Sequence, residues 1–182
     1  MKTVTLDTVC LLKVLDNSPE SEALFEILSW HKLEKIKLYV SNRIFDHDTS
    51  KMRAEQIEDL NRLIESYKIT VEGSVFRSSF SMSDGRDLLS GGPSLRTSKE
   101  IHNFKKLVGE DPAIKYPLNA TLSNKLGDYD SLKDHFCAKR DVFVTLDKKH
   151  YLATEMRPKY AQQLGLIILS PLEFIEQNAH LR

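Results

Sequence analysis

The sequence predicts an α/β protein, namely a three-layer α/β/α sandwich in which helices cover both faces of a mainly parallel central sheet. Strand-like segments alternate with helix-like segments along the chain, as in α/β domains. Four of the strand-like segments are continuous apolar runs, which is typical of strands buried on both faces: VTL, KLYV, DVFVT and LIIL. The length of 182 residues suits one domain, so we expect a single domain over 1–182 with an atypical middle segment at about 70–123.

The first strand and the first two helices are expected at the start of the chain. β-branched residues at 3–6 favour a strand that ends at Asp7, and a short helix over about 9–15 follows it. Ser18 and Pro19 then break the chain. Because serine is a good helix cap and proline suits the first helical turn, the second helix is expected to begin at Pro19.

The middle of the chain is expected to contribute a second strand and two more helices. The strand covers 36–41, and an amphipathic helix follows at 49–67. Apolar residues alternate with polar ones over 69–82, which is typical of strands with one apolar face. A loop rich in glycine, proline and serine separates this segment from a helix at 98–109, which Ser98 is expected to cap.

The last part of the chain is expected to alternate helices with the two remaining strands. Pro112 and Pro117 favour an irregular segment around them, before the next helix. The expected elements, in order, are an irregular segment at 110–127, a helix at 128–140, a strand at 141–145, a helix near 154–164, a strand at 166–169 and a helix at 170–177.

Composition and charge exclude several classes of protein. Lysine plus arginine and aspartate plus glutamate number 26 each, so the formal net charge is zero and bulk positive charge cannot hold nucleic acid. Hydrophobic residues make up 41% of the chain, which argues against disorder. No apolar run approaches the roughly 20 residues of a membrane span, and two cysteines without a C-x-x-C pair favour a reducing compartment. We therefore expect a cytoplasmic protein without membrane contact.

Acidic residues from four separate regions are expected at one edge of the sheet. Asp7 ends the first strand, and Asp147 ends the strand that begins at Asp141 in the sequence DVFVTLD. Asp128 and Asp130 stand at the expected start of the preceding helix, where the helix dipole stabilises a carboxylate. The C-terminal ends of parallel strands meet at one edge of a sheet, and Asp46 also follows a strand, the second, by a few residues. Clustered carboxylates repel one another unless a cation such as Mg²⁺ or Mn²⁺ neutralises them.

Simpler roles exist for each of these residues. An aspartate at a strand end is often a turn residue, and Asp128 or Asp130 could cap a helix. His135 either supports the metal site or is a core histidine, and Lys148 and Lys149 either contact a phosphate backbone or lie in a solvated turn. The sequence contains no zinc-ligand spacing, Walker loop or Ser-His-Asp order that would favour another chemistry.

Five segments of the chain resemble parts of PIN domains. TVTLDTVCLL resembles the opening strand, RDVFVTLDKKHYL resembles the T-x-D strand, and DYDSLKDHFCAKR resembles the acid-led helix before it. LYVSNRIFDHD resembles the segment that carries a further acid, and GLIILSPLEFI resembles the terminal strand and helix. The resemblance covers residues 3–67 and 124–176, whereas the segment 70–123 is longer than in compact PIN toxins.

The resemblance implies a metal-dependent nuclease, most often one that cuts single-stranded RNA with Mg²⁺ or Mn²⁺. It implies that Asp7 and Asp147 are catalytic metal ligands and that Thr145 supports Asp147 by side-chain hydrogen bonding. Asp128 matches the third catalytic acid best, with Asp130 as the other candidate ligand.

The resemblance is weakest at Asp46, where PIN domains prefer a glutamate. The shorter side chain would bind the metal through water or not at all. A catalytically degenerate PIN-like module that binds RNA or a protein partner is therefore the alternative to a nuclease. A nuclease could be a toxin of the VapC kind, with an antitoxin or a homodimeric partner, or a free-standing enzyme. A metal-dependent phosphatase would want a D-x-D at the first strand, and LDTV lacks the second aspartate.

Overall fold

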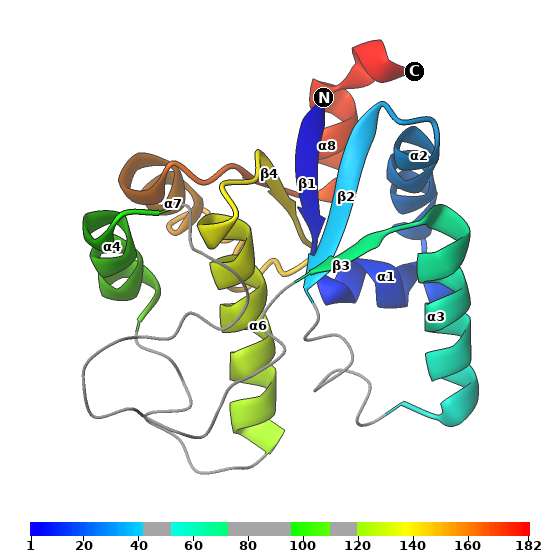
Figure 1. The fold of residues 1–182 in the computed structure, drawn as a ribbon, viewed down its shortest axis with the longest axis horizontal. Helices are drawn as coiled ribbons and strands as arrows, with labels where there is room; N and C mark the ends of the chain where they lie inside the picture. Colours follow the sequence, from blue (N-terminus) through cyan, green and yellow to red (C-terminus); the bar gives the residue numbers. More distant parts are fainter. Residues whose placement is uncertain (42–51, 73–95, 110–119) are drawn as a thin grey trace.

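The computed structural model describes residues 1–41, 52–72, 96–109 and 120–182, with side chains for all of these except 120–128. These residues contain a five-stranded sheet with the strand order β3-β2-β1-β4-β5, and every neighbouring pair is parallel (Figure 1). The strands are β1 (Lys2–Leu6), β2 (Ile36–Ser41), β3 (Thr70–Glu72), β4 (Val142–Val144) and β5 (Ile168–Leu169). The predicted α/β/α sandwich with a parallel sheet is confirmed.

Among the described residues, four helices cover one face of the sheet, and this face is apolar. These helices are α1 (Thr8–Leu15), α2 (Ser21–Lys32), α3 (Ala54–Tyr67) and α8 (Pro171–Gln177). Alternate strand residues point into this layer, and Leu6, Leu38 and Val144 are almost completely buried in it. Trp30 of α2 packs on Phe174 of α8, with ring centroids 6.1 Å apart, so the N-terminal and C-terminal helices share this core.

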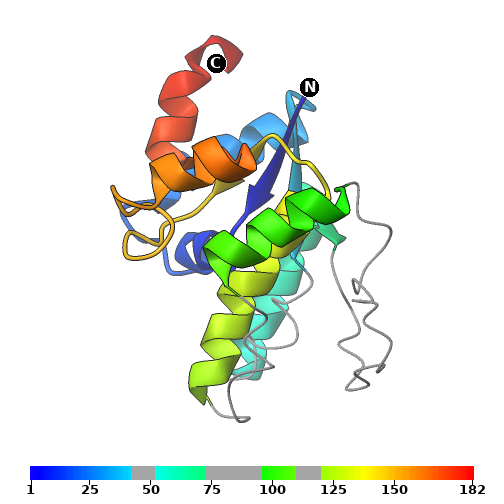
Figure 2. The same cartoon turned by 90° about the vertical axis from the view of Figure 1, so that its left-hand side faces the viewer.

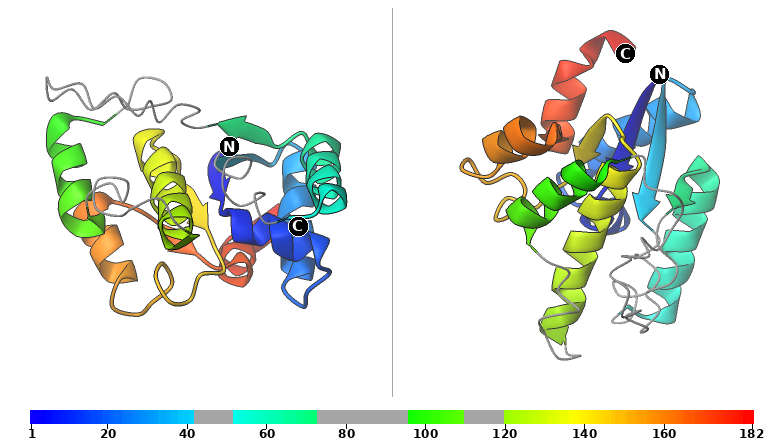
Figure 3. Two further views of the ribbon diagram at one scale, coloured as in Figure 1. Left: turned by 90° about the horizontal axis from the view of Figure 1, so that it is seen from below. Right: turned by 60° about the vertical axis from the view of Figure 1, so that its left-hand side comes forward.

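The opposite face is covered by α4 (Ser98–Val108), α6 (Ala120–Cys137) and α7 (Arg157–Leu164). Figure 2 looks onto this layer, and the left view of Figure 3 shows the two helix layers on opposite sides of the strands. Its apolar core is aromatic: Phe136 stacks on Phe104 at 4.8 Å between centroids, and Phe143 of β4 meets Tyr151 edge-on at 5.4 Å. Of the two cysteines, Cys10 is buried and Cys137 is partly exposed.

Beneath α6 this second face is polar, which the sequence did not indicate. The strand segments were expected to be apolar on both sides. This holds for β4 and β5, whose residues are buried in the two apolar cores, whereas the residues of β1 and β2 alternate. Val4 and Leu6 enter the first core, whereas the intervening Thr5 accepts a hydrogen bond from Arg140 and contacts the ring of His135. The strand side chains that meet α6 or Arg140 in this way are Thr5, Tyr39, Ser41 and Glu72.

The start of α6 differs from the prediction in a way that matters for the acids. The helix was expected to begin at Asp128 after an irregular segment, but it begins at Ala120. Residues 120–126 are ATLSNKL, without proline, and the single Gly127 is tolerated inside a helix. Asp128 and Asp130 therefore lie in the body of the helix, and the stabilisation by free N–H groups that was expected for them does not apply.

Three smaller boundaries also differ, and the first is that of α3, which begins at Ala54 with Arg53 as its cap residue and not at residue 49. Helix α2 begins at Ser21 with Glu20 as its cap residue, so Pro19 lies in the turn before it. Helix α4 is capped by Thr97, whose hydroxyl accepts from the Glu100 amide at 3.3 Å. Of the strands expected over 69–82, the described residues contain β3, and the rest of that segment lies outside them. Within the described ranges, no helix combines the length and apolar character that a bilayer crossing requires.

Candidate functional site

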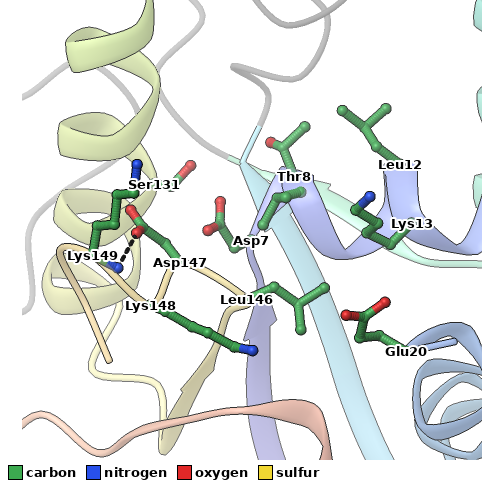
Figure 4. A pocket seen from close by; sticks show the side chains of 11 residues that line it. Asp7, Thr8, Leu12, Lys13, Glu20, Ser131, Leu146, Asp147, Lys148 and Lys149 are labelled. Carbon is green, nitrogen blue, oxygen red and sulfur yellow. Dashed lines mark hydrogen bonds between the residues drawn. The ribbon is translucent and has the colours of Figure 1, made fainter. Parts of the chain in front are cut away.

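The candidate site lies where the order of the strands in the sheet reverses, between β1 and β4. From β1 the chain builds outward through β2 and β3, and it later returns to place β4 on the other side of β1. In open parallel sheets such a switch point leaves a crevice at the C-terminal ends of the two strands. Asp7 follows β1 and Asp147 follows β4 at this point, and both line one cavity of about 560 Å³ (Figure 4). The predicted meeting of these two strands is confirmed.

Asp7 is held almost completely inside the protein. It is 7% exposed, and its backbone N–H donates to the carbonyl of Val144 at 2.9 Å. The hydroxyl of Thr145 donates to its carboxylate at 2.6 Å and accepts from the backbone N–H of Asp147 at 3.0 Å. Thr145 was expected to support Asp147. It does so through the backbone amide, and the carboxylate that it contacts belongs to Asp7.

Asp147 is fixed by the turn that follows it. One carboxylate oxygen accepts from the backbone N–H groups of Lys149 and His150, at 2.9 and 3.1 Å, and the other lies 2.8 Å from Nδ1 of His150. Burial alone would raise the pKa of Asp147, but these hydrogen bonds outweigh burial and lower the pKa. The side chain is therefore an ionised, preoriented carboxylate at the wall of the cavity.

Of the two candidate acids on α6, the structure describes the side chain of Asp130 but not that of Asp128. The side chain of Asp128, the preferred third ligand, lies outside the described residues, as does the whole of Asp46. Asp130 is 3% exposed, and its neighbour Ser131 lines the same cavity as Asp7 and Asp147. The structure thus places the α6 backbone beside the cavity and buries Asp130, the second candidate for the third ligand.

A fourth acid, Asp134, belongs to this region although sequence analysis did not single it out. It lies one helical turn after Asp130 and accepts a hydrogen bond of 2.6 Å from the hydroxyl of Ser41, at the end of β2. Burial raises the pKa of Asp134 to about 6, and the negative charge of Asp130 adds to the rise. The available signal was the spacing of four between the two aspartates, which places both on one face of a helix.

Asp134→Asn is expected to stabilise the protein at neutral pH. Because the pKa of Asp134 in the fold, about 6, exceeds its ordinary value of 3.8, folding favours the protonated form. Ionisation of Asp134 therefore lowers the free energy of unfolding. This loss is absent below pH 3.8, grows as pH rises to about 6 and is then constant, at most about 3 kcal/mol. Asparagine keeps the acceptor for Ser41 without the charge.

The measurement is urea unfolding of wild type and Asp134→Asn across this pH range. The difference in unfolding free energy should grow from about zero near pH 4 to its maximum near pH 7. Asp16→Asn, at an exposed position after α1, controls for the loss of one negative charge. A difference between wild type and Asp134→Asn that stays flat with pH would contradict the assigned environment.

His135 is a core residue. Its ring is completely buried, Nδ1 lies 2.9 Å from the hydroxyl of Thr5, and the ring meets Phe143 edge-on. Burial, with a smaller effect from the charge of Arg140, lowers the pKa of His135 to about 3. Within the described residues Nε2 has no hydrogen-bond partner, and His135 does not line the cavity. Of its two predicted roles, the geometry favours the core histidine.

The donor set suits a hard divalent cation only in part. Asp7 and Asp147 supply carboxylate oxygens, which Mg²⁺ and Mn²⁺ prefer. In the parts of the chain that the structure describes, no three side chains among histidine, cysteine, aspartate and glutamate are grouped so that they could hold a metal ion. Of the other predicted ligands, Asp130 is described and buried, whereas Asp46 and the Asp128 side chain lie outside those parts.

Comparison with known proteins does not assign the chain to a family. No family model matches the chain, and a search of the curated proteins finds no significant match.

Proposed function

We propose that the protein is a metal-dependent nuclease that cuts single-stranded RNA, as its resemblance to PIN domains implies. The observation that carries the proposal is the pair Asp7 and Asp147, which leave adjacent parallel strands at the switch point of the sheet and line one cavity. Two carboxylates that follow rigid neighbouring strands provide two preoriented oxygen ligands for a hard cation. The sequence offers no side-chain nucleophile in a recognisable arrangement, which suits attack by water.

Each residue has a distinct task in this proposal. Asp7 and Asp147 would hold Mg²⁺ or Mn²⁺ together with Asp46 and one of the α6 acids, Asp128 or Asp130. Such an ion supplies an activated water and stabilises charge on the scissile phosphate. Thr145 keeps the Asp7 carboxylate oriented by donating to it at 2.6 Å.

The cations at the cavity have a task of their own. Lys148 and Lys149 directly follow Asp147 and line the cavity with it. They would offset the negative charge of an approaching RNA strand, since the chain as a whole carries no net positive charge.

A binding module without catalysis is the second candidate. One observation favours it: aspartate stands at position 46, where PIN domains prefer a glutamate. In that case the same cavity would bind RNA or a protein partner without cutting it.

The two candidates are separated by metal dependence. We expect Mn²⁺ in large excess to stabilise the folded protein by about 3 kcal/mol, because it binds only the folded state, and so to raise Tm by about 5–10 °C. We also expect the same preparation to cleave a labelled pool of single-stranded RNA with Mn²⁺ and not with EDTA. A rise in Tm without cleavage of any RNA would favour the binding module, and no rise in Tm would overturn the metal site.

A further inference from the structure

The cavity has a second wall on the side away from Asp147. Lys13 comes from the last turn of α1, Glu20 precedes α2, and Lys148 follows β4. Figure 4 shows Lys13 and Glu20 on the same side of the cavity, with Leu146 projecting between Lys148 and Glu20. Three elements that are far apart in sequence therefore bring two ammonium groups and one carboxylate to the same wall.

Glu20 is a charged group held near both lysines. Its carboxylate is exposed, and a hydrogen bond with its own backbone N–H is the largest cause of its lowered pKa. The positive charges of Lys13 and Lys148 lower the pKa further. Both lysines are near enough to this carboxylate to lower its pKa, and all three groups line one cavity, so another anion in that cavity would meet the same two positive charges.

The remaining lining of this wall is apolar. Val9 and Leu12 of α1, together with Leu146, form it. Two cations beside an apolar surface match one nucleotide unit, since its phosphate needs positive charge and its sugar and base offer apolar faces. A cavity of about 560 Å³ is within the size range of small-molecule sites, so it can admit such a unit.

Charge balance explains why an internal competitor would matter here. The cavity is lined by three acids, Asp7, Glu20 and Asp147, and by three lysines, Lys13, Lys148 and Lys149. Fixed charges of both signs therefore cancel, and an RNA strand gains little attraction until one acid is withdrawn or neutralised. Asp7 and Asp147 accept hydrogen bonds from other residues, whereas the exposed Glu20 carboxylate is held mainly by its own backbone N–H and can exchange that bond for water.

We propose that Lys13 and Lys148 form a subsite for the backbone phosphate next to the scissile one, and that Glu20 occupies this subsite in the free protein as an internal competitor. The inference rests on the proposed nuclease function for the identity of the neighbouring phosphate. It predicts that Glu20 lowers RNA affinity by competing for these two lysines, and not merely by adding one negative charge to the protein.

Binding is measured apart from cleavage, by fluorescence anisotropy of a labelled single-stranded RNA of about ten nucleotides in EDTA at low salt. Lys13→Gln and Lys148→Gln should each weaken binding about threefold, and each should make the salt dependence shallower by about 0.7 in slope. Lys37→Gln is the matched control. Lys37 is exposed near the N-terminal end of β2, opposite Thr3, whereas the cavity lies at the C-terminal ends of the strands. Lys37→Gln should leave affinity unchanged.

Glu20→Gln should tighten RNA binding about threefold, whereas Glu22→Gln should not. Glu22 is exposed in the first turn of α2, so the two variants change the net charge equally and lie two residues apart. In a Lys13→Gln, Lys148→Gln background, Glu20→Gln should have no further effect, because residues that share one interaction are not additive.

Several results would overturn the subsite: equal effects of Glu20→Gln and Glu22→Gln, an effect of Glu20→Gln that persists without the two lysines, or no RNA binding by the wild type. Failure of the proposed function gives a different result. If the binding pattern is as expected but the wild type cleaves no RNA with Mn²⁺, the phosphate subsite stands and the nuclease activity does not.

Discussion

Asp7→Asn and Asp147→Asn are each expected to reduce Mn²⁺-dependent cleavage of single-stranded RNA by about 100-fold or more. A metal-activated water supplies several kcal/mol of transition-state stabilisation, and each 1.36 kcal/mol corresponds to about tenfold in rate. Asparagine removes the charge that holds the cation but preserves the shape of the side chain. At position 147 it can still accept the amide hydrogen bonds of Lys149 and His150, so the turn should survive.

Asp141→Asn is the matched control for this experiment. Asp141 precedes β4 as Asp147 follows it, and its carboxylate also accepts local hydrogen bonds, from the amide and hydroxyl of Thr3 at 2.7 Å each. It lies at the opposite edge of the sheet, so its loss should leave cleavage unchanged. Cleavage that persists in both Asp7→Asn and Asp147→Asn would show that the activity has another source, provided that circular dichroism shows both variants folded.

Phe136→Ala is expected to cost about 3–5 kcal/mol of stability, the range for removing a buried phenylalanine. Phe136 is 1% exposed, stacks on Phe104 with the ring planes 25° apart, and lies under the guanidinium of Arg96 at 4.4 Å from Cζ to the ring centroid. Removing the ring leaves a cavity between α6 and α4 and deprives Arg96 of its aromatic partner. Because α6 carries Asp130, Ser131 and Asp134, the two acids and the cavity-lining serine depend on this contact for their position.

Urea unfolding measures the effect, with Phe25→Ala as the control. Phe25 lies on α2 and is 37% exposed, so the same substitution there should cost about 1 kcal/mol or less. Since Phe136→Ala could leave too little folded protein to measure, Phe136→Leu provides a milder variant that should still cost more than Phe25→Ala. Equal costs at the two positions would contradict the packing of α6 against α4.

The sheet and the pair at its switch point could be predicted because both follow from local patterns. The β-branched run before Asp7 and the run VFV before Asp147 each specify a strand, and parallel strands bring their C-terminal ends to one edge. What those patterns do not encode is which acids of α6 face the sheet. That depends on where the helix begins and how it is rotated, and its start was placed eight residues too late.

The polar layer under α6 was missed for a related reason. Threonine is a good strand former, so VTL in β1 predicts one buried run, although its residues alternate between the two faces. Thr5 and Ser41 then gained partners that lie far away in sequence: His135 and Arg140 for the first, and Asp134 for the second. Such pairs are specified by tertiary packing and not by any short motif.

The order of the strands has a consequence for the time at which the site forms. β1 is synthesised well before its partner β4, because the bond from Thr145 to Asp7 joins residues 138 positions apart. Contacts this distant form late, because the entropy of closing so long a loop must be overcome first. A growing chain can therefore assemble α1, α2 and β2 on β1 while Asp7 still lacks its partner. If the protein cuts RNA, a partial chain cannot yet do so, and the message from which it is being translated is spared until the last strands are in place.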